Sequence, residues 1–146
     1  MLPADDRDST REVFFRAWHY HRGDQALEGV ERVLVAVALR HAEYHALLND
    51  PHQHLARDYS PLLGETNPFL HMGLHVAIEE QLALDEPRGI RGIYSKLLAR
   101  QTDEHSTQHL IMECLGEWLW KAQRQGAGLD SALYLDCLTC LASAKS

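Results

Sequence analysis

Apolar residues recur along this chain every three or four positions, which is the spacing of one face of an α-helix. No stretch alternates apolar and polar residues with the period of two that is typical of a half-buried β-strand. The pattern predicts a first helix that is capped by Ser9 or Thr10 and stops at Gly23. It predicts a second, kinked helix over about residues 26–48.

A long connection follows at residues 50–67, where Pro51, Pro61 and Gly64 interrupt any period. Asn67 and Pro68 then mark a helix start, because a capping side chain is followed by proline at the first helical position. Further helices are predicted over residues 68–85, 88–100, about 103–125 with Thr102 or Asp103 as its cap, and 130–141. The prediction is an all-α fold, a single-domain helical bundle of about five to six helices over residues 1–146.

Composition narrows the class of protein. Of 146 residues, 45% are hydrophobic and 24% are charged, which is the balance of a globular domain and not of a disordered segment. No apolar run reaches the ~18 residues of a membrane span, and the polar, acidic first residues do not resemble a secretory signal. The net charge of −7 argues against a basic nucleic-acid-binding surface. We expect a soluble cytoplasmic protein, either monomeric or a homo-oligomer.

Three cysteines are too few, and odd in number, for a disulfide framework, which favours a reducing compartment. Cys137 and Cys140 have the spacing of a redox or zinc motif, but only Cys114 is left to complete it. Because both lie in an apolar helical segment, we interpret them as small core residues.

Histidine is the residue type that stands out, with ten in the chain. Three pairs are four residues apart, where random placement would give fewer than one: His41/His45, His71/His75 and His105/His109. Four residues along a helix turn a side chain by only ~40° and raise it by ~6 Å, so both imidazoles of a pair can reach one metal ion. A single pair of this kind is more often a surface or hydrogen-bonded feature, and the repetition is what favours metal ligands.

Two of the pairs continue into a glutamate at the same spacing. These triads are His71, His75, Glu79 and His105, His109, Glu113. If their helices run parallel, the ligands stack in layers, with Glu79 beside Glu113. His41 and His45 would complete the set of metal ligands. The other four histidines, His19, His21, His52 and His54, are expected to be solvated. Of these, His52 and His54 are placed where they could cover the site.

Imidazole and carboxylate ligands in a bundle core favour iron or manganese, with zinc as the alternative. A triad spans ~12 Å along its helix, which is long for one ion. Either two ions ~3.5–4 Å apart share the site, or the histidines hold one ion and the glutamates orient them.

Two segments carry a family resemblance: residues 67–81, NPFLHMGLHVAIEEQ, and residues 111–124, IMECLGEWLWKAQR. Together with residues 41–48, HAEYHALL, they resemble a small proteobacterial family, domain of unknown function 1841, over about residues 10–140. The resemblance implies an α-helical cytoplasmic protein and supplies no activity. In ligand types and spacing, the pairs His75/Glu79, His109/Glu113 and His41/His45 are also similar to those of hemerythrin-type di-iron bundles, though their order along the chain differs.

The leading hypothesis is therefore a metal-binding helical bundle with a dinuclear non-haem iron or manganese site. The protein would bind oxygen or peroxide as a small-molecule partner, or carry out an oxidation. No catalytic residue is assigned. The alternatives are a mononuclear zinc protein, structural or hydrolytic, and a metal-free acidic adaptor that binds a partner protein. Haem held between two histidines is a weaker alternative, because no attachment motif is present.

Overall fold

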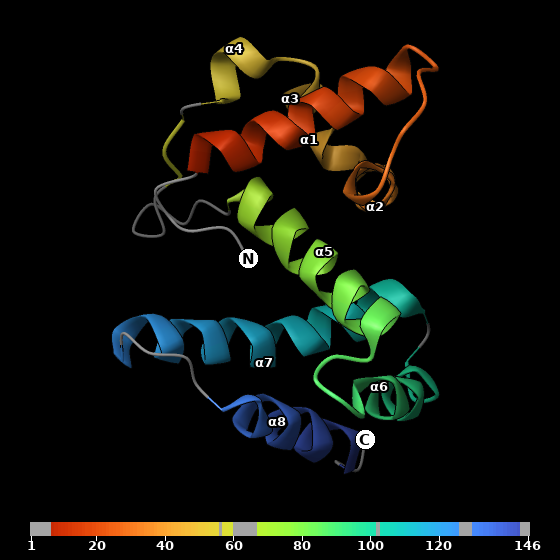
Figure 1. Ribbon diagram of the computed structural model, residues 1–146, viewed down its shortest axis with the longest axis vertical. Helices are drawn as coiled ribbons and strands as arrows, with labels where there is room; N and C mark the ends of the chain where they lie inside the picture. The colour runs from red at the N-terminus through yellow and green to blue at the C-terminus, as the bar shows by residue number, and fades with distance from the viewer. Residues whose placement is uncertain (1–6, 56, 60–66, 102, 126–129, 144–146) are drawn as a thin grey trace. The chain divides into compact units, whose positions relative to one another are not determined.

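A computed structural model describes residues 7–55, 57–59, 67–101, 103–125 and 130–143 (Figure 1). The all-α class predicted from the sequence is confirmed, since the described residues contain helices and no strand. In chain order the elements are α1 (Arg7–Arg22), α2 (Val30–Leu39), the 3-10 turn η2 (Ala42–Tyr44), α3 (His45–Leu48), α4 (Pro51–His54), α5 (Pro68–Leu84), α6 (Ile90–Leu98), α7 (Glu104–Gln125) and α8 (Ser131–Ser143). The described residues thus form more helices than the five to six predicted, because the second predicted helix is broken and the connection after it contains a helix of its own.

The chain divides into two compact units, Met1–Val76 and Ala77–Ser146. Helix α5 crosses this division without interruption, so its first turns belong to the first unit and its last turns to the second. Each unit has its own core and is described by itself. None of the described helices is long and apolar enough to span a membrane.

The core of the first unit lies where α1 packs against α2 and the start of α5. Phe14 and Phe15 contact the ring of Phe69 at centroid distances of 6.2 and 5.5 Å. Val37 and Met72 are fully buried beside them. Because Phe69 and Met72 flank His71 in sequence, this packing fixes the first turns of α5, which carry two of the candidate ligands.

The second predicted helix ends at Leu39 and does not continue to residue 48. His41 has φ −124° and ψ 69°, which are not helical angles, and the chain resumes as η2 and α3. Gly29, with a φ of 53°, precedes the first residue of α2 and explains why this helix starts later than Ala26. The break matters for the site, because His41 and His45 do not share one helix face.

The second unit is built from α6, α7, α8 and the end of α5 (Figure 1). Its core residues are Ile78, Ile90, Leu97, Ile111, Leu115, Tyr134 and Leu138. The Tyr134 hydroxyl donates a hydrogen bond of 2.7 Å to Oε1 of Gln81 and so ties α8 to α5. The turn before α6 uses Gly89 at a φ of 99°, a conformation that favours glycine.

Side-chain caps confirm most of the predicted helix starts. Asn67 accepts hydrogen bonds from the backbone N–H groups of Phe69 and Leu70 at the start of α5. Asp103 caps α7 and Asp130 caps α8 in the same way. The alternative cap of α7, Thr102, lies outside the described residues. The predicted cap of the first helix is wrong, because Ser9 and Thr10 lie inside α1, which already contains Arg7.

Candidate metal centre

His41 lies directly after α2 and is buried, with 1% of its surface exposed. Its Nδ1 is 2.8 Å from the carbonyl oxygen of Val37 in the last turn of α2, an oxygen that also accepts a 3.1 Å hydrogen bond from the backbone N–H of Arg40. A carbonyl can only accept a hydrogen bond, so Nδ1 carries the proton and donates it. In the neutral form of the ring, the lone pair is then at Nε2, the nitrogen that a metal ion would bind.

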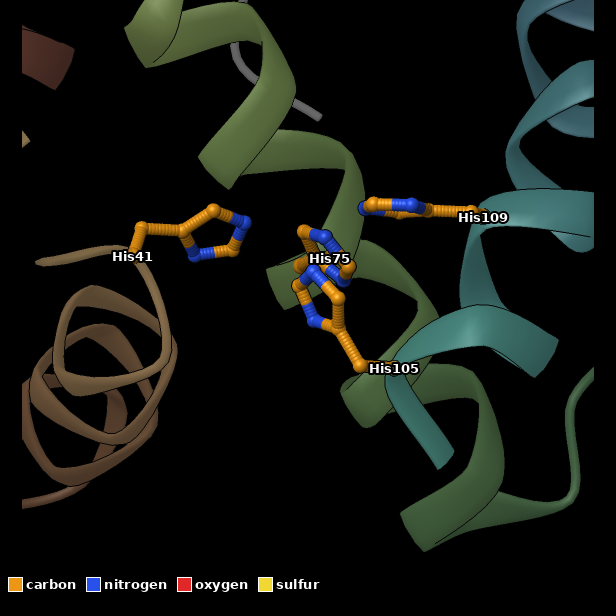
Figure 2. A group of neighbouring side chains, drawn as sticks. All are labelled: His41, His75, His105 and His109. Carbon is orange, nitrogen blue, oxygen red and sulfur yellow. The ribbon is translucent and has the colours of Figure 1, made fainter. Parts of the chain in front are cut away.

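His71 and His75 lie on successive turns of α5 and bring their rings to His41. The three ring centres form a near-equilateral triangle, with distances of 4.8 Å between His41 and His75, 5.0 Å between His41 and His71, and 5.0 Å between His71 and His75. One ring nitrogen of His41 lies within 4.8 Å of one of His75. Figure 2 shows the ring of His41 pointing from the end of α2 toward His75 on α5. His75 is fully buried and His71 is half-buried.

These distances fit a shared metal ion. An imidazole bound at ~2.0–2.1 Å has its ring centre ~3.2 Å from the ion, so two imidazoles at the tetrahedral angle have centres ~5.2 Å apart. The observed values of 4.8–5.0 Å are within a few tenths of an ångström of that spacing.

Tyr44 closes one side of this histidine group. Its ring stacks on His41 with centroids 5.4 Å apart and planes 11° from parallel. Burial, and secondarily the nearby Glu43 carboxylate, raises the pKa of the Tyr44 phenol above its usual 10.0. The phenol of Tyr44 is therefore un-ionised at ordinary pH where it lines the candidate centre. The histidine spacing gave no indication of it.

His45 is turned away from this group. Its Nε2 lies 2.8 Å from the carbonyl oxygen of Ala38, and its ring packs on Trp18 at a centroid distance of 4.6 Å. Nε2 must donate to that carbonyl, so His45 hydrogen-bonds the last turn of α2. The structure therefore does not bring His45 together with His41 as a second ligand.

In the second unit, His105 and His109 lie one turn apart on α7 with ring centres 4.2 Å from each other (Figure 2). One ring nitrogen of His105 lies within 4.8 Å of one ring nitrogen of His109, so this pair too has the geometry to share an ion. His105 is half-buried and His109 is exposed. The i, i+4 spacing brings this pair together as predicted.

The two glutamates are placed differently from the prediction. Glu79 accepts a 2.8 Å hydrogen bond from the side chain of Gln108, which is fully buried on α7. Glu113 is exposed and lies five residues, or ~7.5 Å, beyond Gln108 along α7. The predicted alignment of Glu79 with Glu113 is therefore not what the structure shows.

Gln108 was missed because the buried face of α7 was assigned one position out of phase. The buried residues of α7 are Thr107, Gln108, Ile111, Met112, Cys114 and Leu115. The prediction placed His109 among the metal ligands in the bundle core. The apolar series Ile111, Cys114 and Leu115, extended back by one turn, would have identified Thr107 and Gln108.

The remaining histidines are outside the candidate centre. His19 and His52 are exposed, as predicted. His21 and His54 are half-buried, with His21 beside Trp18 and Nδ1 of His54 3.3 Å from the hydroxyl of Tyr59. The interpretation of these two as solvated is therefore only partly right.

The cysteine interpretation is wrong. Cys114 of α7 and Cys137 of α8 form a disulfide, and Cys140 is a free, exposed cysteine. The sequence could not show the pairing, because it depends on how α8 packs against α7.

Residues 6–140 match a family model described as domain of unknown function (DUF1841). No curated protein and no solved structure matches the chain. The likeness to hemerythrin-type bundles therefore stays a prediction from ligand spacing.

Proposed function

This chain belongs to the family described as domain of unknown function DUF1841, and we propose that it is a metal-binding protein whose first unit holds a transition-metal ion between His41, His71 and His75. The observation that carries the proposal is the triangle of three imidazoles with centres 4.8–5.0 Å apart. Histidine spacing alone would not supply this argument, because His41 comes from outside α5.

The orientation of His41 supports a metal site over a hydrogen-bonded cluster. Histidines that bind metals usually donate their second N–H to a carbonyl or a carboxylate, which fixes the ring and makes the ligating nitrogen more basic. The bond from Nδ1 of His41 to the Val37 carbonyl is of this kind. It also restrains the ring, so little conformational freedom would be lost on metal binding.

The ligand set favours an ion that prefers nitrogen. Imidazoles suit zinc and ferrous iron, whereas manganese prefers carboxylate oxygens. Glu79 is engaged with Gln108, and Glu113 is exposed, so the three histidines are better suited to one ion than to a carboxylate-bridged pair. Three protein ligands leave a position for water or a small molecule, which at zinc supports hydrolysis and at iron supports oxygen or peroxide chemistry.

The dinuclear iron or manganese centre remains a prediction, and in the second unit the pair His105 and His109 is the part of it that keeps suitable geometry. The metal content of the chain distinguishes these cases. One zinc or one iron per chain supports the mononuclear site in the first unit, and two ions per chain support participation of the pair on α7. A protein without metal after growth in supplemented medium would favour the adaptor hypothesis.

The test uses protein purified without a histidine tag and without a nickel column. Elemental analysis and an absorption spectrum give the identity and number of the ions. His75→Ala should remove the metal from the first unit, because it deletes a fully buried ligand. His52→Ala, at an exposed histidine of α4, is the matched control and should retain the wild-type content. Full metal content in His75→Ala would refute the assignment.

A second comparison separates metal loss from misfolding. His71→Ala changes a half-buried ligand and should be the milder substitution. Metal that binds only the native state raises its stability by ~2.7 kcal/mol when free metal is one hundred times its Kd. A chelator should therefore lower the melting temperature of the wild type and leave that of His71→Ala almost unchanged, while their metal-free melting temperatures stay close.

A further inference from the structure

The three cysteines of the second unit lie on two packed helices. Cys114 on α7 is buried, and its disulfide partner Cys137 on α8 is half-buried. Cys140 follows Cys137 by three residues on α8 and is exposed as a free thiol. One cysteine of the disulfide is thus within a helical turn of a thiol that faces solvent.

The disulfide borders a small hollow of about 110 Å³. The hollow is lined by Cys114, Glu117, Trp118, Lys121, Leu133 and Cys137. Space next to a disulfide lets its sulfur atoms move without displacing packed side chains. Both sulfur atoms of the disulfide therefore border open space, and Cys140 is not among the residues that line it.

Helical geometry allows Cys137 to pair with Cys140. Residues three apart in an α-helix have Cα atoms ~5 Å apart, inside the usual range of ~4.4–6.8 Å for a disulfide. The present pair has a Cα separation of 5.8 Å. Both pairings are accessible to Cys137 on the Cα criterion.

We propose that Cys114, Cys137 and Cys140 form a thiol–disulfide relay that carries reducing equivalents from the surface to the bond between α7 and α8. In the first step, the Cys140 thiolate bonds to Sγ of Cys137 and the bond from Cys137 to Cys114 breaks. Cys114 leaves as a thiolate and takes up a proton from solvent, which replaces the one Cys140 released. This exchange neither oxidises nor reduces the protein.

In the second step, a dithiol reductant attacks the surface disulfide between Cys137 and Cys140. The reductant supplies two electrons and becomes a disulfide, and the two cysteines become thiols. The covalent tie between α7 and α8 is then lost. Stacking of Trp118 on Tyr134, at 5.3 Å and 12° between planes, still joins the two helices, so reduction loosens the second unit without unfolding it.

The first test asks whether Cys137 and Cys140 can form a disulfide when Cys114 is absent. Cys114→Ser, first reduced and then incubated with oxidised glutathione, should form the bond between Cys137 and Cys140. After alkylation and tryptic digestion, this bond is a closed loop within the peptide of residues 125–145, lighter than the reduced peptide by two hydrogen atoms. Stable glutathione adducts on both cysteines, or two unreacted thiols, would overturn the proposal.

The second test measures the relay in the protein with its disulfide intact. Dithiothreitol is added, samples are quenched in acid and alkylated, and the link between the peptides of residues 101–121 and 125–145 is followed by mass spectrometry. Cys140→Ser should slow loss of this link by about tenfold or more, because the reductant must then attack a half-buried sulfur directly. Thr139→Ser, at the exposed neighbouring position, should react like the wild type. Equal rates in Cys140→Ser and the wild type would overturn the relay.

Discussion

Arg11 is the residue whose removal we expect to destabilise the first unit most among its charged side chains. It lies on α1 and is 2% exposed. Its Nη1 donates toward the carbonyl oxygens of His54, Leu55 and Arg57 at 3.3, 3.1 and 2.6 Å. The guanidinium also lies 4.8 Å from the ring centre of Phe69. One side chain thus holds the segment after α4 and contacts the first turn of α5, which leads into His71.

The size of the effect follows from these contacts. Nη1 has two N–H groups, and a hydrogen bond to a charged group contributes ~1.5–3 kcal/mol. Two such bonds give ~3–6 kcal/mol before the cost of keeping the charge out of water is subtracted, which is several kcal/mol for a buried ion. Arg11→Ala also leaves a cavity and strands the carbonyl groups. We therefore expect a net loss of ~3–4 kcal/mol in the free energy of unfolding.

For a chain of this size, ~1 kcal/mol shifts the melting temperature by ~2–4 °C, so Arg11→Ala should melt ~10 °C below the wild type. Far-UV circular dichroism follows the transition, and amide hydrogen exchange should rise at residues 54–59 before it rises elsewhere. Arg16→Ala is the matched control on the same helix, because Arg16 is exposed and its ion pair with Glu31 is long, at 3.9 Å. A loss below ~1 kcal/mol in Arg11→Ala, equal to that of the control, would refute this reasoning.

Three further predictions concern the second unit. Tyr134→Phe removes the hydrogen bond to Gln81 and should lower the free energy of unfolding by ~1 kcal/mol in urea titrations, with no change if that bond contributes nothing. Hydrogen bonds from the backbone N–H groups of Arg91 and, secondarily, Gly89 hold the pKa of Asp85 below its usual 3.8. The ionised carboxylate therefore contributes stability that is fully present above pH 3.8. This contribution is lost as the pH falls through the lowered pKa. The wild type should therefore melt above Asp85→Asn near pH ~6 and equally with it once the carboxyl is protonated. Complete reduction of the disulfide opens a loop of 23 residues and should lower stability by ~3 kcal/mol, measured by thermal melts with and without a dithiol.

The starts of α5, α7 and α8 and the histidine pairs on α5 and α7 could be predicted because they depend on neighbours in sequence. Asn67 and Pro68 start α5 through a cap that spans three residues, and the cap is present as expected. His105 and His109 approach each other because four residues make about one helical turn. His71 and His75 do so for the same reason.

The predictions failed where a side chain hydrogen-bonds a backbone carbonyl and the helix ends. They also failed where packing against another helix decides which face of a helix is buried. His41 and His45 each bond a carbonyl near the end of α2, which a count of apolar positions cannot register. They consequently lie on different elements, and only His41 joins the histidines of α5. On α7, one position decides whether Gln108 or His109 is buried, and packing against Glu79 decides for Gln108.

The sequence by itself determined the all-α class, the extent of α5 and α7 and the residue types of the candidate metal site, because helical period and capping are local properties. Tertiary structure alone decided that His41 completes a triangle with His71 and His75, that Arg11 donates to the carbonyls of His54, Leu55 and Arg57, and that Cys114 meets Cys137. Each of these contacts joins residues more than twenty positions apart. Their geometry depends on how whole helices pack, which a pattern read over one or two turns does not contain.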